Sequence, residues 1–180
     1  MCLDPADRIF AEQGTPMACR AVIFALDTKD AERLLAAEDD GEVMALIEEI
    51  EEESWTGDHY VALDKSWDAL HRCLTDGDLA FGNGDYPLSH AILGGRLLHD
   101  EDDYIVSYVD PDQVREIAAA LATLDEPWLR ERFSTLTFDD YQGTGDEDDI
   151  TYTLAFLPDL KDFYRTAAAN GRAAIFTVDQ

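Results

Sequence analysis

The stretch Cys19–Leu26, CRAVIFAL, decides the fold class of this chain. Its β-branched and apolar residues predict a buried strand. Asp27 or Thr28 follows directly and offers a side-chain oxygen that can cap a helix. The sequence therefore predicts a helix over residues 29–37 (KDAERLLAA), which makes the start of the chain a strand followed by a helix.

Residues 104–109 and 172–178 have the same strand-forming composition, and residues 59–63 form a short extended lead-in to Asp64. Helices are predicted over residues 42–53, from Asp64 as N-cap through Thr75, at the turn 88–95, after Asp110-Pro111, over residues 126–133, and from Ile150 to Asn170 with an interruption or restart at Pro158. These elements predict an α/β (α+β) fold, a helix-rich single domain packed around a small mixed sheet of about three strands.

A single domain over residues 17–180 fits the length of 180 residues, of which 46% are hydrophobic. Residues 1–16 are more polar and are expected to be a flexible extension, so Met17 is also a candidate start. The sequence has neither an apolar run of membrane-spanning length nor a secretory pattern, which favours the cytoplasm and no membrane partner. Three cysteines without a CxxC pattern argue against a disulfide framework or a structural zinc site.

The formal net charge of −27 is the most unusual feature of the composition. Such a charge repels nucleic acids and anionic membranes, and it attracts basic proteins and cations. A surface adapted to high salt would have the same composition, so a partner role and an environmental origin both remain open.

The stretch Leu63–Thr75, LDKSWDALHRCLT, contains the candidate catalytic residues. Asp64, Asp68 and His71 share one helix face with Trp67, and an aspartate could orient His71 as a general base. The competing interpretation is structural: Asp64 caps the helix, Trp67 belongs to the core, and His71 is a partly buried ring. We favour the structural interpretation, because no nucleophile lies near in sequence.

Other site chemistries lack their motifs. The four histidines have no metal-binding spacing, and the acidic loops do not match a calcium-binding pattern. Phosphate-binding glycine loops and the nucleophile elbow of hydrolases are also absent from the sequence. We therefore expect neither a metal nor a cofactor.

Acidic residues are concentrated in blocks without lysine or arginine, at residues 38–58, 97–114 and 134–149. If the blocks converge in space, they form a face that attracts a basic protein, although charge runs are more often a solvated surface. The predicted partner face consists of Glu48, Glu49, Glu51, Glu52, Glu53, Asp100, Glu101, Asp102, Asp103, Asp146, Glu147, Asp148 and Asp149.

Several stretches carry a resemblance to a known family: MACRAVIFALDTKDAERLLAA from Met17, LDKSWDALHRCLT, PLSHAILGG and FYRTAAANGRAAIFTV. Together they resemble the YfbM-like family of bacterial proteins, a domain of unknown function, over residues 17–178. The resemblance implies an α/β domain with many helices around a small sheet, and it implies no catalytic residues. Besides Asp64, it marks the ligand-pocket candidates Lys65, Trp67, His71, Pro87, Leu88 and Gly94.

The sequence thus favours a cytoplasmic, non-enzymatic protein that binds a basic protein partner, as an immunity-type inhibitor or a regulator does. The first alternative is a small-molecule-binding protein or hydrolytic enzyme with a pocket near Asp64 and His71. The second is a salt-adapted domain whose acidity has no partner role.

Overall fold

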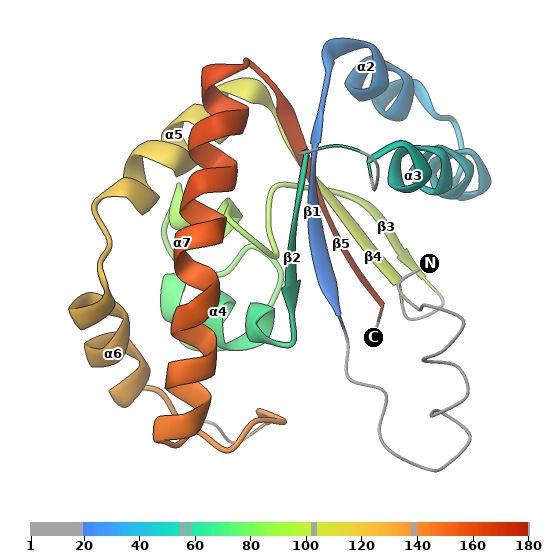
Figure 1. Cartoon of the computed structure of the whole chain (residues 1–180). Helices are drawn as coiled ribbons and strands as arrows, with labels where there is room; N and C mark the ends of the chain where they lie inside the picture. The colour runs from blue at the N-terminus through green and yellow to red at the C-terminus, as the bar shows by residue number, and fades with distance from the viewer. Residues whose placement is uncertain (1–19, 55–56, 58, 102–103, 138–139, 180) are drawn as a thin grey trace.

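The computed structural model describes residues 20–54, 57, 59–101, 104–137 and 140–179 (Figure 1). The predicted extension 1–16, together with Cys19, Asp102 and Asp103 of the sequence predictions, lies outside these residues.

A five-stranded sheet forms the centre of the fold, in the order β2-β1-β5-β4-β3. Each pairing between neighbouring strands is antiparallel. The strands are β1 (Ala21–Leu26), β2 (Tyr60–Asp64), β3 (Arg96–Glu101), β4 (Tyr104–Val109) and β5 (Ala173–Asp179). The α/β class is confirmed, whereas the prediction of a mixed sheet of about three strands is wrong. The two strands that were not counted, β2 and β3, lie at the edges of the sheet.

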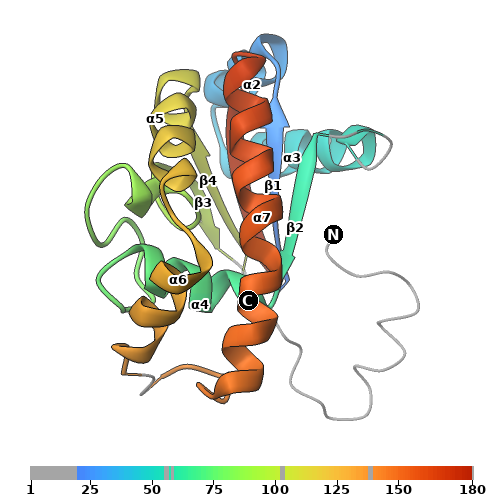
Figure 2. The same cartoon turned by 60° about the vertical axis from the view of Figure 1, so that its left-hand side comes forward.

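Helices cover both faces of the sheet (Figures 1 and 2). One face is covered by α2 (Thr28–Ala36) and α3 (Asp40–Ser54). The other face is covered by α4 (Ser66–Leu74), the short helix η1 (Leu88–His90), α5 (Pro111–Ala122), α6 (Glu126–Ser134) and α7 (Glu147–Ala169). Because both faces are covered, every residue of β1 is buried, which explains the unbroken apolar run of this strand.

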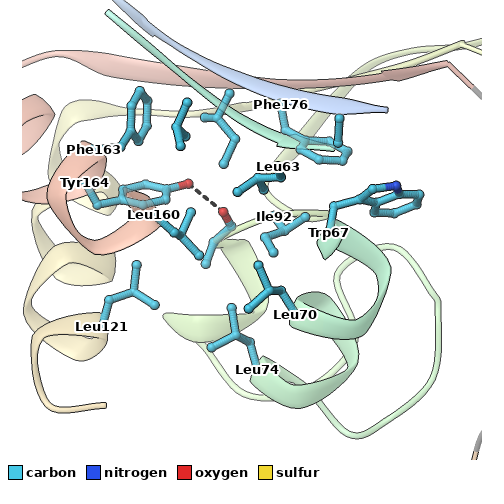
Figure 3. Close-up of a cluster of buried hydrophobic side chains, with 14 of the residues drawn as sticks. Leu63, Trp67, Leu70, Leu74, Ile92, Leu121, Leu160, Phe163, Tyr164 and Phe176 are labelled. Atoms are coloured by element: carbon cyan, nitrogen blue, oxygen red, sulfur yellow. Dashed lines mark hydrogen bonds between the residues drawn. The ribbon is translucent and has the colours of Figure 1, made fainter. Parts of the chain in front are cut away.

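Alternate residues of β1 enter two separate hydrophobic cores. Ala21, Ile23 and Ala25 contribute to the core beneath α4, α5, α6 and α7, and the residues between them contribute to the core beneath α2 and α3. Figure 3 shows side chains of the first core, where Tyr164 of α7 donates a hydrogen bond to the carbonyl of Ala91 at 2.8 Å. This bond joins α7 to the segment that follows η1.

Capping residues in the sequence predicted the start of most helices correctly. Asp27 caps α2, and Asp110 caps α5 in a reciprocal capping box with Gln113. The predicted cap at Asp64 is wrong, because Asp64 is the last residue of β2 with a φ of +45° and Lys65 is the cap position of α4. The predicted interruption at Pro158 is also wrong, since α7 continues through this residue.

Candidate functional site

Asp64 lies at a junction of three elements rather than on the face of α4. Its Oδ2 accepts a hydrogen bond from the Tyr152 hydroxyl of α7 at 2.8 Å, and its Oδ1 lies 3.2 Å from Nε of Arg20. Burial, and next the contact with Asp64, raise the pKa of Tyr152 to about 12. The carboxylate thus connects the end of β2 to α7 and to the residue before β1, whereas His71 bonds to Ala80, Asn83 and Leu93.

His71 is fully buried, and both ring nitrogens have partners. Nε2 lies 2.9 Å from the carbonyl of Ala80 and 2.7 Å from Oδ1 of Asn83, while Nδ1 accepts the amide of Leu93 at 3.4 Å. Because both neighbours of Nε2 are acceptors, the ring carries its proton there. Burial lowers the pKa of His71 and keeps the ring neutral. The imidazole therefore fastens the 76–93 loop to α4, and neither nitrogen is free to accept a substrate proton.

The ligand-pocket candidates lie on α4, just before it, or in the loop that follows it. Trp67 is 4% exposed, and its ring centroid lies 5.7 Å from that of Phe176. Gly94 is buried so closely against the turn that a Cβ at this position would come within 2.2 Å of the Ser89 carbonyl. Pro87 and Leu88 are half-buried, and Lys65 is exposed. Trp67 thus packs α4 against β5, and Gly94 fits closely within its own turn.

Arg72, one residue after His71, is the feature that the sequence interpretation missed. The side chain is 1% exposed, with Nε 2.5 Å from Oδ1 of Asp68 and Nη1 2.8 Å from Oδ1 of Asp140. Its guanidinium also lies over the Tyr141 ring, 5.6 Å from the centroid. Burial raises the pKa of Asp68, and the hydrogen bond from Arg72 lowers the pKa of Asp140. The i,i+4 spacing of Asp68 and Arg72 could have indicated the first contact, but the second joins residues 68 positions apart.

The predicted acidic blocks lie on opposite sides of the sheet. α3 packs beside β3, where Nδ1 of His99 lies 3.3 Å from Asp40 and the Tyr104 hydroxyl donates to Glu51 at 2.8 Å. The block at the start of α7 lies on the other face of the sheet (Figure 1). The blocks on α3 and β3 therefore adjoin each other, and the third block is separate from them.

The acids of the predicted partner face have different environments. Glu51 is 5% exposed, and Glu49 forms an ion pair with Arg33 at 2.7 Å. In the third block Asp146 caps α7, and Asp149 accepts hydrogen bonds from Tyr141 and Gly145. Glu147 pairs with Arg130 at 2.7 Å, while Asp148 is exposed. We call the exposed set Glu48, Glu52, Glu53 and Glu101 the α3–β3 acidic surface. Asp100 is also exposed, but it lies opposite Ile105, which belongs to the core beneath α4, α5, α6 and α7, so its side chain points to the other face of the sheet.

Two grooves are hollowed between elements on the α7 side of the sheet. The first, of about 650 Å³, lies between β2 and α7, and we call it the β2–α7 groove. The second, of about 710 Å³, lies between α5 and α7 and is lined mainly by alanine and leucine side chains. Neither groove is lined by Asp64, His71 or the ligand-pocket candidates.

The described ranges contain neither a cluster of metal ligands nor a membrane-spanning helix. In that part of the chain no three His, Cys, Asp or Glu side chains gather as a metal site would require. None of the helices described is both long enough and apolar enough to cross a bilayer. Burial raises the pKa of Cys73 to about 12, so this thiol stays protonated at neutral pH.

Comparisons with known proteins agree with this geometry. The fold is similar to the crystal structure of YfbM from Escherichia coli, a protein of unknown function, with a TM-score of 0.63 and 22% sequence identity. The similarity covers 88% of this chain and 99% of the other. No curated protein matches the sequence. Residues 17–177 match the family described as domain of unknown function DUF1877. The chain therefore belongs to the DUF1877 family, and the predicted YfbM-like resemblance is confirmed.

Proposed function

We propose that this domain is a binding module that engages a cationic protein partner through the α3–β3 acidic surface. The observation that carries the proposal is the junction of two acidic elements at one place in the fold. Glu48, Glu52 and Glu53 lie exposed on α3, and Glu101 lies exposed on the neighbouring strand β3, on the face of the sheet that α3 covers. Their carboxylates add to the field of a chain with a net charge of −27.

The surface is held in place by contacts beneath it. Asp40 and Glu51, at opposite ends of α3, contact His99 and Tyr104 of the β3–β4 hairpin. Val43, Ile47 and Ile50 bury the other side of the helix in the core against the sheet. A rigid acidic surface loses little conformational entropy on binding, which favours association.

Repulsion within the surface also favours a cationic partner. α3 has no basic residue in its sequence, and Glu48 and Glu52 are spaced i,i+4 along it. Like charges at this spacing cost a helix about 0.2–0.5 kcal/mol per pair. A partner with lysine or arginine side chains would relieve this repulsion, and long-range attraction would speed the encounter to as much as about 10⁸–10⁹ M⁻¹s⁻¹ at low salt.

A capture experiment with matched charge variants tests this proposal. The surface variant combines Glu48→Gln, Glu52→Gln, Glu53→Gln and Glu101→Gln. The control variant neutralises the same number of exposed acids elsewhere: Asp78→Asn, Asp85→Asn, Glu131→Gln and Asp148→Asn. Each immobilised protein is exposed to an extract of the source cells at low ionic strength and again at about 0.5 M salt, where the Debye length falls to a few ångströms.

The proposal expects one basic protein on the wild type and on the control variant, and its loss from the surface variant and at high salt. Equal capture by the two variants would overturn the role of α3 and β3. If neither salt concentration yields a specific partner, the acidity is a property of the surface as a whole, as in salt adaptation, and the proposal fails.

A further inference from the structure

The β2–α7 groove lies along the β2 edge of the sheet. β2 is the first strand in the sheet order, and β1 is its one neighbouring strand among the described residues. The groove is lined by Tyr60, Val61 and Ala62 in succession. Side chains alternate between the faces of a strand, so consecutive lining residues place the groove along the strand edge.

The pairing register gives the direction of the backbone groups at this edge. Ala25 donates to the carbonyl of His59 at 2.7 Å, and Ile23 lies opposite Val61. In an antiparallel ladder, alternate residues point their N–H and C=O groups toward the same neighbour. His59 and Val61 therefore face β1, and the N–H and C=O of Ala62 face away from β1, toward the groove.

The opposite wall of the groove is one face of α7. Asp159, Asp162, Thr166 and Asn170 line it together with the buried Phe163 and Ala167. From Asp159 to Asn170 the helix rises about 16 Å at 1.5 Å per residue. An extended segment of about five residues, at roughly 3.3 Å each, has the same length.

The two ends of the groove carry opposite charge. Arg172 and His59 lie at one end, where Nη2 of Arg172 donates to Nε2 of His59 at 3.4 Å. No described carboxylate lies within ion-pair distance of Arg172, although acids outnumber bases by 40 to 13 in the chain. Asp159 and Asp162 lie further along α7, toward the other end.

We infer that this groove binds the C-terminal end of an extended cationic peptide, which adds to the sheet as a strand beside β2. An antiparallel strand would run from the Asp64 end of β2 toward His59, which brings its terminal carboxylate to Arg172. A lysine or arginine about four residues earlier would then reach Asp159 and Asp162. Ala62 would supply backbone hydrogen bonds to the added strand, as in other cases of strand addition.

Charge favours such a peptide over a second copy of this chain. Pairing two β2 edges would bring together two molecules of net charge −27, whereas a cationic segment is attracted. The groove is separate from the α3–β3 acidic surface, because α3 covers the other face of the sheet. The inference therefore does not depend on the function proposed above.

A labelled peptide tests the inference with the intact protein. The probe is Lys-Ala-Val-Thr-Val with a free C-terminal carboxylate, and its binding is followed by fluorescence anisotropy. Two matched peptides carry a C-terminal amide or a glutamate in place of lysine. We expect each change to weaken binding about tenfold or more, because each removes a charge-assisted hydrogen bond.

Three protein variants identify the site. Arg172→Gln should abolish the preference for the free carboxylate, and Asp159→Asn should weaken the preference for lysine. Ala62→Pro removes the outward N–H of an edge strand, a position where proline is tolerated, and should abolish binding. If this variant does not fold, a probe with N-methylated backbone amides makes the same test on the unchanged protein.

The α3–β3 surface variant should bind the probe as the wild type does, apart from the general effect of net charge seen in the matched control. Equal affinity for the acid and amide peptides, or undiminished binding to both Arg172→Gln and Ala62→Pro, would overturn the inference. No measurable binding of the probe, or dimerisation of the free protein through β2, would overturn it as well.

Discussion

Replacement of Arg72 by methionine should destabilise the protein far more than removal of its exposed partner. Methionine keeps the volume of the aliphatic stem but removes the guanidinium from a site where the side chain is 1% exposed. Asp68, 14% exposed, then loses its closest cation, while Asp140, 72% exposed, remains solvated.

The magnitudes follow from this difference in exposure. Breaking a buried ion pair by removing one partner costs about 3–5 kcal/mol, because a buried charge is left uncompensated. Neutralising a solvated partner costs about 0–1 kcal/mol, because water replaces the lost contact. We therefore expect Arg72→Met to lower the free energy of unfolding by about 3 kcal/mol and Asp140→Asn to lower it by at most about 1 kcal/mol.

Urea unfolding at pH 7, followed by far-UV circular dichroism, measures both values. The double variant Asp68→Leu/Arg72→Met should recover most of the loss, because well-packed apolar residues often replace a buried pair without net cost. If Arg72→Met loses less than about 1 kcal/mol, or no more than Asp140→Asn, the buried network does not anchor α4 as inferred.

Two further predictions concern the other buried polar groups. The first is that His71→Gln should reduce the loss of stability below pH 6.5. Burial lowers the pKa of His71 in the folded protein, so as the pH falls through 6.5 the unfolded chain gains this proton before the folded protein does. The wild type therefore loses up to about 1.4 kcal/mol of unfolding free energy per pH unit until the pKa of the folded ring is reached. Parallel slopes of unfolding free energy against pH for the two proteins would contradict this. Tyr164→Phe removes the hydrogen bond to the buried Ala91 carbonyl and should cost about 1–3 kcal/mol, seen as a lower midpoint of thermal unfolding, whereas Tyr152→Phe, at an exposed tyrosine, should cost less. Equal costs for the two tyrosines would show that burial does not set the value of these bonds.

Short-range signals in the sequence predicted the elements that depend on neighbouring residues. Asp110-Pro111 specifies the start of α5, because the aspartate accepts a first-turn amide and proline lacks one. β1 and β5 are central strands, so their apolar runs identify them directly. β3 was missed because its sequence, RLLHDE, is largely exposed at the edge of the sheet, where pairing with β4 rather than composition holds it.

Long-range contacts explain what the sequence could not predict. Pro158 is exposed while Leu157 and Leu160 are buried, so tertiary packing keeps α7 continuous through a residue that ends many helices. His71 is buried in the structure, and its partners lie 9 to 22 residues away in a segment without periodicity, so its surroundings could not be predicted from the sequence. The acidic blocks on α3 and β3 adjoin because the sheet order places the β3–β4 hairpin beside α3.

Amide hydrogen exchange tests the proposed binding surface most directly, with the captured basic partner present and absent. Partner binding at this surface should slow exchange on α3 and on the described part of the β3–β4 hairpin, and it should leave exchange over residues 146–149 at the start of α7 unchanged. Protection at the start of α7, or protection spread evenly over the surface, would contradict the assignment of partner binding to the α3–β3 acidic surface.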